Sequence, residues 1–281
     1  MLPTALNTLL LDLSPMALAF SGGLDSRFLA HAALQLLSKG MQVKLYHITG
    51  PHVPKGESAA ALAWARERGL VLDTVAVNPL ENPDVRANNR NRCYYCKRQL
   101  FESLQKVVAG RKILCDGSNL SDQDSYRPGL RALKELGIRS PLAEAGLTKE
   151  QIRALAASSG MDRPNQAARP CLLTRFAYEL APTTEALAAL ENAERTVEEI
   201  LKTAVASGFL DALPDFRLRL VSDDDQQGAS LPFGAELHLN ANLKTATELE
   251  VLRAISKEGF PKPRLVAMQR VSGHYDRSRA Q

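Results

Sequence analysis

The sequence predicts an α/β protein in which a domain with a parallel sheet precedes a smaller α+β domain. Short apolar runs alternate with helix-like segments up to about residue 180, and such alternation is typical of parallel sheets. Beyond that point the pattern changes to one long helix and a few alternating strands. The length of 281 residues and a hydrophobic fraction of 45% allow two ordinary domains. We therefore predict domains at 1–180 and 181–270, followed by a basic tail at 271–281.

The elements of the first domain follow from periodicity and turn residues. Four apolar runs predict strands at 16–20, 42–49, 70–77 and 112–117. After the first run, apolar side chains recur on one helical face up to Gly40, which predicts a helix over 25–40. Further helices are predicted over 58–69, 99–110 and 148–160. Thr148 and Gln151 match a capping box at the start of the last of these.

The second domain is predicted from a different order of elements. Its helices are expected over 183–207 and 245–259, and its strands over 216–221, 235–239 and 264–269. Arg217 and Arg219 alternate onto one face of the first strand. They either meet a nucleotide phosphate or pair with Glu236 on the next strand, and we favour the pairing.

Composition narrows the class of ligand and the location. The net charge of +4 suits anionic ligands such as nucleotides and does not by itself indicate nucleic acid. No signal peptide and no apolar run of bilayer length are recognisable, so we expect a cytoplasmic protein with no membrane partner. In a reducing cytosol, the spacing of the four cysteines indicates metal binding or chemistry before disulfides.

The first motif with chemistry is the glycine loop FSGGLDS between the first strand and the first helix. Backbone N–H groups and a helix N-terminus aimed at one point bind phosphate. Gly22 and Gly23 allow close backbone approach, while Ser21 and Ser26 add hydroxyl donors. The loop is neither a Walker A motif nor G-x-G-x-x-G. Asp25 suits Mg²⁺ beside a triphosphate, the alternative being a charge that only complements the helix dipole.

A second polar loop, CDGSNLSDQDSYRPG, follows the fourth strand. It carries Asp116, Asp122, Asp124 and Arg127, with turn residues at its end. Ligands of open α/β sheets sit beyond the carboxyl ends of the strands, so this loop and the glycine loop are placed to face one crevice. The alternative is a solvated polar loop, and this loop alone does not decide between them.

The cysteines of RCYYCK, Cys93 and Cys96, have three interpretations. A dithiol redox pair belongs to a thioredoxin-like unit, which nothing else in the chain resembles. A structural zinc needs four ligands, and Cys93, Cys96 and Cys171 leave one to find. Three thiolates also suit a [4Fe-4S] cluster with one open iron. Cys115 lies in an apolar run and is expected to pack as a small hydrophobe.

The motifs together resemble a known family. SGGLDS resembles the pyrophosphate loop of the N-type (PP-loop) ATP pyrophosphatases, which have an adenine nucleotide alpha hydrolase-like fold. RCYYCKRQLF, DGSNLSDQDSYRPGL, SPLAEAGLTKEQIRALA and CLLTRFAY extend the resemblance to the LarE family of ATP-dependent sulfur transferases. The resemblance is close over roughly residues 16–180. In the C-terminal domain it extends only to the order of helices and strands. The chain has RFAYE where the family commonly has RFPYG, and Ser125 where an aspartate is frequent.

The resemblance implies a reaction in nickel-pincer nucleotide cofactor synthesis. ATP would be split between its α and β phosphates to adenylate a carboxylate of a pyridinium dicarboxylate mononucleotide, which becomes a thiocarboxylate. It implies ATP, Mg²⁺ and a [4Fe-4S] cluster on Cys93, Cys96 and Cys171 as cofactors. A sacrificial Cys171 that donates its own sulfur is the second reading. Asp25, Cys171 and Arg175 are the implied catalytic residues, and Asp116 and Arg127 join the glycine loop in cofactor binding.

Other roles and partners remain as alternatives. Lys97 either holds a substrate phosphate or is a solvated lysine. The expected partners are a nucleotide substrate and a sulfur donor, and the sequence leaves a homo-oligomer open. A tRNA thiolase of the same superfamily is the alternative enzyme, but RNA is not expected because no RNA-binding module is recognisable. A zinc-stabilised nucleotide-binding protein without catalysis is the third hypothesis.

Overall fold

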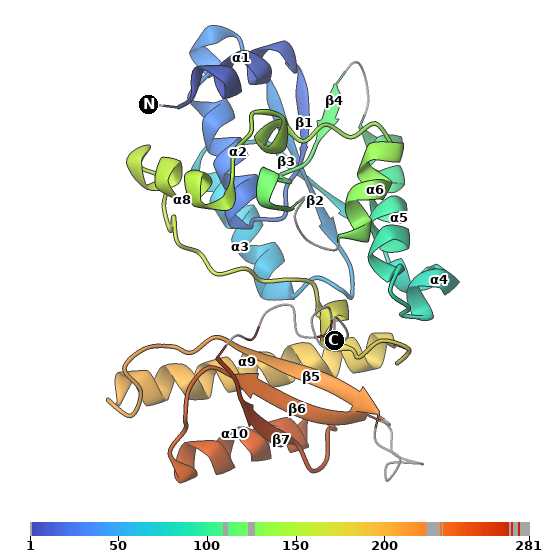
Figure 1. Cartoon of the computed structure of the whole chain (residues 1–281), viewed down its shortest axis with the longest axis vertical. Coiled ribbons are helices and arrows are strands. Elements are labelled where there is room, and N and C mark those ends of the chain that lie inside the picture. Colours follow the sequence, from blue (N-terminus) through green and yellow to red (C-terminus); the bar gives the residue numbers. More distant parts are fainter. Residues whose placement is uncertain are drawn as a thin grey trace. The chain divides into compact units, whose positions relative to one another are not determined.

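The computed structural model describes residues 2–108, 112–122, 127–222, 231, 233–269, 271 and 275 (Figure 1). The chain forms two compact units. The first comprises Met1–Val85 and Asn91–Pro170, and the second comprises Arg86–Arg90 and Cys171–Gln281. The chain therefore passes between the units three times. The predicted domain ends at 180 and 270 stay predictions, and most of the predicted tail lies outside the described residues.

The first unit contains a sheet of four parallel strands, as the sequence predicts. The strand order is β3-β2-β1-β4, so the first strand is central and the fourth lies on its other side. In register, Leu18 of β1 lies between Leu45 of β2 and Cys115 of β4. The strands are β1 (Met16–Ala19), β2 (Val43–Thr49), β3 (Leu72–Ala76) and β4 (Ile113–Cys115).

Helices cover both faces of this sheet (Figure 1). One buried cluster joins α1, α2, α3, α7 and α8 to the first face, and a second joins α5 and α6 to the other. The α-helices are α1 (Thr4–Asp12), α2 (Leu24–Leu34), α3 (Lys55–Glu67), α4 (Pro83–Arg86), α5 (Arg92–Val107), α6 (Pro128–Glu135), α7 (Pro141–Glu144) and α8 (Lys149–Ser158). Short 3-10 turns lie at η1 (Leu37–Lys39), η2 (Pro79–Glu81) and η3 (Leu120–Asp122). The three-layer α/β arrangement is that of a PP-loop domain.

Helix boundaries are where the structure departs most from the prediction. Helix α5 begins at Arg92, so it contains RCYYCK, whereas the sequence predicts a helix only from residue 99. Asn91, which precedes α5, belongs to the residue types that commonly begin helices, although its side chain makes no capping hydrogen bond here. The predicted helix over 25–40 ends at Leu34, and a 3-10 turn continues it to Gly40. The capping box of Thr148 and Gln151 is confirmed.

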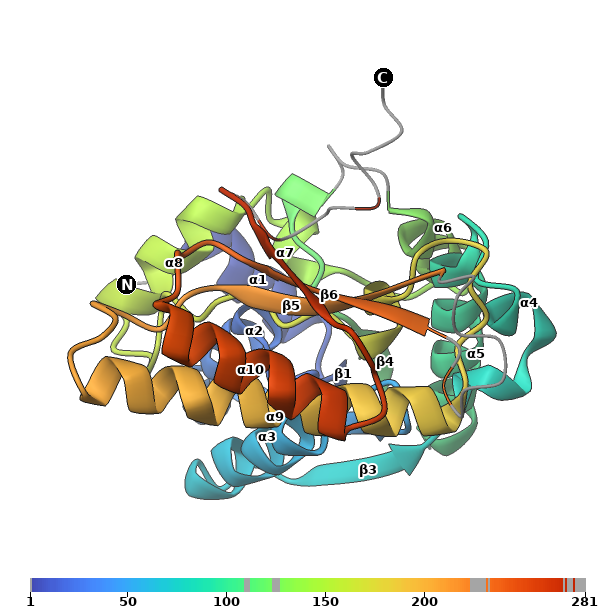
Figure 2. The same cartoon turned by 90° about the horizontal axis from the view of Figure 1, so that it is seen from below.

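The second unit is the predicted smaller α+β unit. Its sheet has the order β5-β6-β7, with the first pair antiparallel and the second parallel. Helices α9 and α10 lie side by side against this sheet (Figure 2). The elements are η4 (Leu172–Arg175), α9 (Thr184–Ala206), β5 (Phe216–Ser222), β6 (Phe233–Leu239), α10 (Thr245–Lys257) and β7 (Arg264–Ala267). No helix within the described ranges is apolar and long enough to cross a bilayer.

Candidate active site

The candidate site lies where the strand order of the first sheet reverses. The chain runs from β1 outward to β2 and β3, and then returns to place β4 beside β1. At such a switch point the loops that follow the two neighbouring strands, here β1 and β4, leave room for a ligand. The two loops concerned are the glycine loop after β1 and the polar loop after β4. Gly117 of the polar loop lies directly against Ser26 and Asp25, so the loops lie side by side as their positions predict.

The glycine loop is folded as a phosphate loop requires. Gly22 adopts a φ of +77°, a left-handed conformation that favours glycine, and Gly23 is the N-cap of α2. A Cβ on Gly22 would lie 3.0 Å from the Cβ of Ala61, so α3 limits the loop from behind. The hydroxyls of Ser21 and Ser26 lie 3.1 Å apart. Because the first N–H groups of a helix have no partner within the helix, the start of α2 offers donors for phosphate.

Gly117 is the contact point between the two loops, and its replacement is a direct test of that contact. An added Cβ would lie 3.0 Å from the amide nitrogen of Ser26 and 3.2 Å from its Cα, both backbone atoms. We expect Gly117→Ala to lower the free energy of unfolding by about 1–3 kcal/mol, because the start of α2 must move. Gly56→Ala is the matched control, since a Cβ added to Gly56 in α3 would have no heavy atom within 4 Å. Equal stabilities of the two variants in urea unfolding would contradict the contact.

Asp25 is held by a lysine that the sequence analysis did not single out. Lys149 Nζ lies 2.8 Å from Oδ1 and 2.6 Å from Oδ2 of Asp25. Burial raises the pKa of Asp25, and the charge of Asp122 adds to this, while Lys149 and Arg127 oppose it. The capping box marks Lys149 as the first residue of α8. The contact of Lys149 with Asp25, however, joins residues that are 124 positions apart in the sequence. Only the fold reveals this partner.

Asp122 and Arg127 form an ion pair at the edge of the same site. Arg127 Nη1 lies 2.9 Å from Asp122 Oδ1, and the backbone N–H of Asn119 donates to Asp122 Oδ2 at 3.0 Å. The negative charge of Asp122 also raises the pKa of Asp25. Of the other residues that the sequence singled out in this loop, Asp124 and Ser125 lie outside the described residues.

Asp116 is buried at the end of β4 and has several hydrogen-bond donors around it. Its Oδ1 accepts from the hydroxyl of Ser140 at 2.6 Å and from the backbone N–H of Ser118 at 3.2 Å. Its Oδ2 accepts from the hydroxyl of Ser118 and lies 3.7 Å from Lys97 Nζ. These hydrogen bonds let the Asp116 carboxylate hold Ser118 and Ser140 in place. The ATP-binding role that the family resemblance implies for Asp116 stays a prediction.

The side chain of Lys97 extends past Gly129 toward Asp116, in the space that a Cβ on Gly129 would crowd. A Cβ on Gly129 would lie 3.1 Å from Cγ and Cδ of Lys97, so the start of α6 packs directly on this side chain. The ammonium group also lies 5.7 Å from the ring centre of Phe101. The structure therefore places Lys97 beside the polar loop. Phosphate binding by Lys97 stays a prediction.

Cys93 and Cys96 lie one turn apart on α5, so their thiols project from the same side of the helix. Cys93 is half-buried with Arg92 Nη2 at 3.7 Å from its Sγ, and Cys96 is buried. Both belong to the first unit, whereas Cys171 is the first residue of the second unit's longer segment. Within the described ranges, no group of three or more His, Cys, Asp or Glu side chains forms a ready metal site. Burial raises the pKa of Cys115 to about 12, in keeping with its expected role as a packed hydrophobe.

Arg175 is buried in the second unit and binds the turn that carries Cys171. Its Nε and Nη2 donate to the two carboxylate oxygens of Glu194 on α9, at 2.9 and 3.0 Å. Its Nη1 lies 3.4 Å from the carbonyl oxygen of Cys171. The geometry is that of a bidentate ion pair that fixes η4 on α9. The catalytic role implied for Arg175 by the family resemblance stays a prediction.

The arginines of β5 are bound within the second unit. Arg219 lies opposite Glu236 in the register of β5 and β6, and the two are bridged by His238. Arg219 Nε donates to His238 Nδ1 at 3.2 Å, so the other ring nitrogen carries the proton and donates to Glu236 at 2.9 Å. Arg217 Nη1 donates to Asp215 at 2.9 Å. Arg219 thus faces Glu236 as predicted but is linked to it through His238, whereas Arg217 lies opposite His238 and forms its ion pair with Asp215.

A buried histidine beyond the end of β2 makes stability depend on pH. Burial, with His47 as the second cause, lowers the pKa of His52 to about 4. His52 takes up a proton near pH 6.5 in the unfolded chain but only near pH 4 in the folded chain. The free energy of unfolding therefore falls as the pH falls from 6.5 to about 4. We expect His52 to contribute about 3 kcal/mol to that loss. Urea unfolding at several pH values should give a flatter profile for His52→Phe, and an unchanged profile would refute the assignment.

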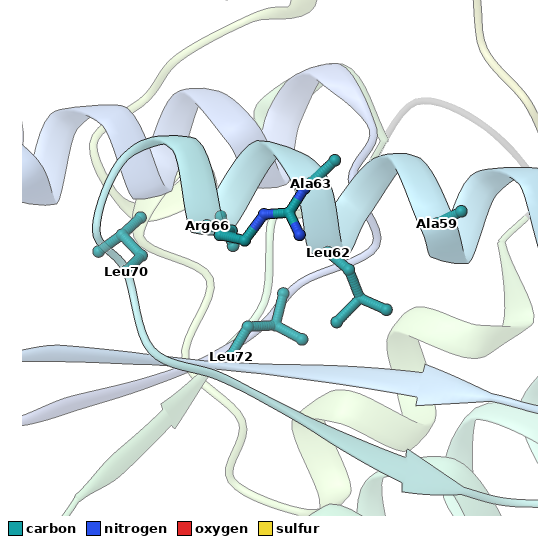
Figure 3. A pocket seen from close by; sticks show the side chains of 7 residues that line it. Ala59, Leu62, Ala63, Arg66, Leu70 and Leu72 are labelled. Atoms are coloured by element: carbon teal, nitrogen blue, oxygen red, sulfur yellow. The ribbon is translucent and has the colours of Figure 1, made fainter.

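A groove between α3 and the edge strand β3 lies away from these groups (Figure 3). Its lining side chains are Ala59, Leu62, Ala63, Ala65, Arg66, Leu70 and Leu72. Arg66 carries the charge among these seven residues, and the candidate site residues lie elsewhere. The residues described as lining the groove therefore include no acid, base or nucleophile.

Comparisons with known proteins decide the family. No family model matches the chain. The chain is 36% identical over 185 residues to an uncharacterised protein of Synechocystis, covering 65% of the chain and 68% of that protein. It is 30% identical over 191 residues to pyridinium-3,5-bisthiocarboxylic acid mononucleotide synthase of Lactiplantibacillus plantarum, covering 67% and 69%. The chain belongs to the LarE family. A further relative of this LarE-type chain, an uncharacterised protein of Methanocaldococcus jannaschii, is 30% identical over 190 residues, covering 67% and 71%.

Proposed function

We propose that this chain is an ATP-dependent sulfur transferase that converts a carboxylate of a pyridinium dicarboxylate mononucleotide into a thiocarboxylate, with AMP and pyrophosphate as by-products. Membership of the LarE family supports the sulfur transfer and the class of substrate. The single observation that carries ATP use is the phosphate loop at the start of α2, with the left-handed Gly22 and the neighbouring Lys149. Positive charge and backbone donors converge there, as a polyphosphate requires.

The proposed reaction has two balanced steps. A carboxylate oxygen of the substrate attacks the α-phosphorus of ATP, the bond between the α-phosphorus and the bridging oxygen breaks, and pyrophosphate leaves. A sulfide nucleophile then attacks the acyl carbon, and AMP leaves with the former carboxylate oxygen. Each thiocarboxylate therefore consumes one ATP. The donors at the start of α2 and the ammonium of Lys149 are placed to stabilise the charge on the leaving pyrophosphate.

Asp25 fits a magnesium ion as a ligand. Mg²⁺ prefers carboxylate and phosphate oxygens, and Asp25 is a carboxylate at a phosphate loop with Asp122 acting on it. A magnesium ion held there would neutralise the polyphosphate charge. Lys149 Nζ lies 2.6 Å from Asp25 Oδ2 and balances its charge.

The cysteines fit a [4Fe-4S] cluster by their donor set. Cys93 and Cys96 present two thiols on one side of α5, and Cys171 would supply the third. A cluster held by three thiolates would leave one iron open for the incoming sulfide. The protein's part is to hold these thiolates and to keep Cys171 fixed through Arg175.

The test is substrate-dependent pyrophosphate release. The full chain, purified without oxygen, is mixed with ATP, Mg²⁺, sulfide and pyridinium-3,5-biscarboxylic acid mononucleotide. We expect pyrophosphate and a product in which sulfur replaces oxygen, in equal amounts by a pyrophosphate assay and mass spectrometry. The control omits the mononucleotide and should release no pyrophosphate. Pyrophosphate that appears without thiocarboxylate, or only when RNA is added, would refute the proposal.

A further inference from the structure

The phosphate loop is bracketed by two residues that lead to one carboxylate. Phe20 precedes Ser21, and Arg27 follows Ser26. Arg27 binds Asp162 directly, and Phe20 stacks on Trp64, which also binds Asp162. Asp162 lies beyond the end of α8, far from the loop in sequence. Both ends of the loop therefore depend on the same side chain.

Arg27 is the direct link. It is 1% exposed, and its Nη1 donates to Asp162 Oδ2 at 2.9 Å. Its Nη2 donates to the carbonyl oxygen of Arg163 at 3.1 Å. Arg163 has a φ of +47°, a left-handed conformation that costs a bulky residue roughly 1 kcal/mol or more. The hydrogen bonds from Arg27 hold this turn, so the segment is built around the arginine.

Trp64 is the indirect link. The rings of Phe20 and Trp64 stack with their centres 5.3 Å apart. The indole N–H of Trp64 donates to Asp162 Oδ1 at 2.9 Å, and Arg68 donates to the same oxygen at 2.6 Å. The guanidinium of Arg68 also lies 4.3 Å from the centre of the Trp64 ring. The side chain that supports the start of the loop is thus clamped by Asp162 and Arg68.

The neighbours of Asp162 are all hydrogen-bond donors, so they favour its ionised carboxylate. Its two oxygens accept from Trp64, Arg68, Arg27 and Arg163, four N–H donors in all. Burial alone would raise the pKa of Asp162, but these hydrogen bonds and the arginine charges together hold it below its usual value. An asparagine has one acceptor oxygen and would turn an N–H₂ group toward two of these donors. A substitution of the same shape should therefore break the arrangement.

We propose that Asp162 is a positioning residue for the phosphate loop, holding both ends of the loop through Arg27 and through Trp64 and Phe20. This inference rests on the proposed function, in which the loop binds ATP. Asp162 touches neither nucleotide nor substrate in this role. It acts by fixing the start of α2, whose N–H groups must converge on the phosphates.

The test uses the full chain with Asp162→Asn, and Asp73→Asn as the matched control. Asp73 also forms an ion pair, with Lys44 at 2.6 Å, on the edge strand β3. The dissociation constant of α,β-methylene-ATP with Mg²⁺ is measured by calorimetry well below the unfolding temperature. We expect binding about tenfold weaker for Asp162→Asn and unchanged for Asp73→Asn, as for one displaced charge-assisted contact. Unchanged binding by folded Asp162→Asn would overturn the proposal, even if the variant melts earlier.

Hydrogen exchange gives a second readout that does not need the nucleotide to bind. In Asp162→Asn, peptides that cover 20–34 should exchange faster, while peptides of α9 should match the wild type. If the analogue fails to bind the wild-type chain, ATP use is wrong, and the exchange result still decides the role of Asp162. Uniform loss of protection in both units would show general destabilisation and would also overturn the proposal.

Trp64→Phe keeps the inference testable if Asp162→Asn does not fold. It retains the stack on Phe20 and removes only the indole N–H that binds Asp162. We expect analogue binding about threefold weaker, with faster exchange at the start of the loop. Wild-type values of both quantities in this variant would contradict the indirect link.

Discussion

Asp25→Asn is expected to slow pyrophosphate release from ATP by about 100-fold or more, because the neutral amide no longer neutralises the polyphosphate through Mg²⁺. Asp25 is the acidic residue of the phosphate loop, and its carboxylate lies within hydrogen-bonding distance of Lys149 at both oxygens. Pyrophosphate release is measured with saturating ATP and Mg²⁺. A wild-type rate in this variant would remove Asp25 from the proposed mechanism.

The fold is expected to survive this change. Burial raises the pKa of Asp25, so keeping the carboxylate ionised there already has a cost in stability. Asparagine has nearly the same shape, and its carbonyl oxygen can still accept from Lys149. We therefore expect an unfolding temperature close to that of the wild type. A large drop in that temperature would mean that the loss of activity is structural.

Lys149→Met separates the lysine from the metal site. Without Lys149, the main opposing influence on the raised pKa of Asp25 is lost, and the pKa should rise further. The rate of pyrophosphate release should then need a higher pH to reach its plateau, in addition to being lower. Asp73→Asn on β3 is the control for a lost surface ion pair and should leave the pH profile unchanged.

The phosphate loop was predictable because its signals are local. A strand, two glycines and a helix follow one another within a short stretch of chain, and each is specified by its own side chains. The parallel sheet followed in the same way from the alternation of elements. The side-by-side position of the polar loop followed from a general property of open α/β sheets. The contact of Gly117 with Ser26 is where the polar loop and the phosphate loop meet.

Partners that are distant in sequence were not predictable. Lys149 and Asp162 are both far from the phosphate loop along the chain, and one sequence gives no signal for pairing charges at such separations. Lys149 is the first residue of α8 and Asp162 follows its end, and the packing of α8 on α2 brings them to Asp25 and Arg27. The capping box marked where α8 begins, but the direction of the lysine depends on the packing.

Helix α5 shows a different limit. The side chain of Asn91 before RCYYCK makes no capping hydrogen bond, and α5 packs against α6. Tyr94, Arg98 and Glu135 form a hydrogen-bonded group between these helices. That group fixes the rotation of α5, and with it the direction of Cys93 and Cys96. The sequence predicted the cysteines as a pair, whereas their common helical face came from the structure.

The cysteine series has the other large expected effect. If Cys93, Cys96 and Cys171 hold one cluster, each change to alanine leaves an iron without its protein ligand. We expect all three variants to lose the iron and the visible absorbance of the cluster equally, and to lose thiolation. Binding of α,β-methylene-ATP should persist in all three, because the phosphate loop contains no cysteine.

Cys115→Ala is the matched control for this series. Cys115 is fully buried in β4, and burial raises the pKa of its thiol to about 12, so it is not available as a thiolate. The control should keep the iron and the activity per folded molecule, at the cost of some stability. Zinc in place of iron in the anaerobically purified chain would contradict the cluster and favour a structural metal site.

A sacrificial Cys171 makes the opposite prediction for the pair on α5. If the sulfur came from Cys171 itself, Cys93→Ala and Cys96→Ala would each still complete one turnover. That turnover breaks the bond between Cβ and sulfur and leaves dehydroalanine at position 171, so the chain becomes lighter by one H₂S. With sulfide supplied, we expect no such loss in the intact mass of the wild type. A single-turnover product from Cys93→Ala, with dehydroalanine at 171, would refute the cluster and leave the paired thiols of α5 without a role in catalysis.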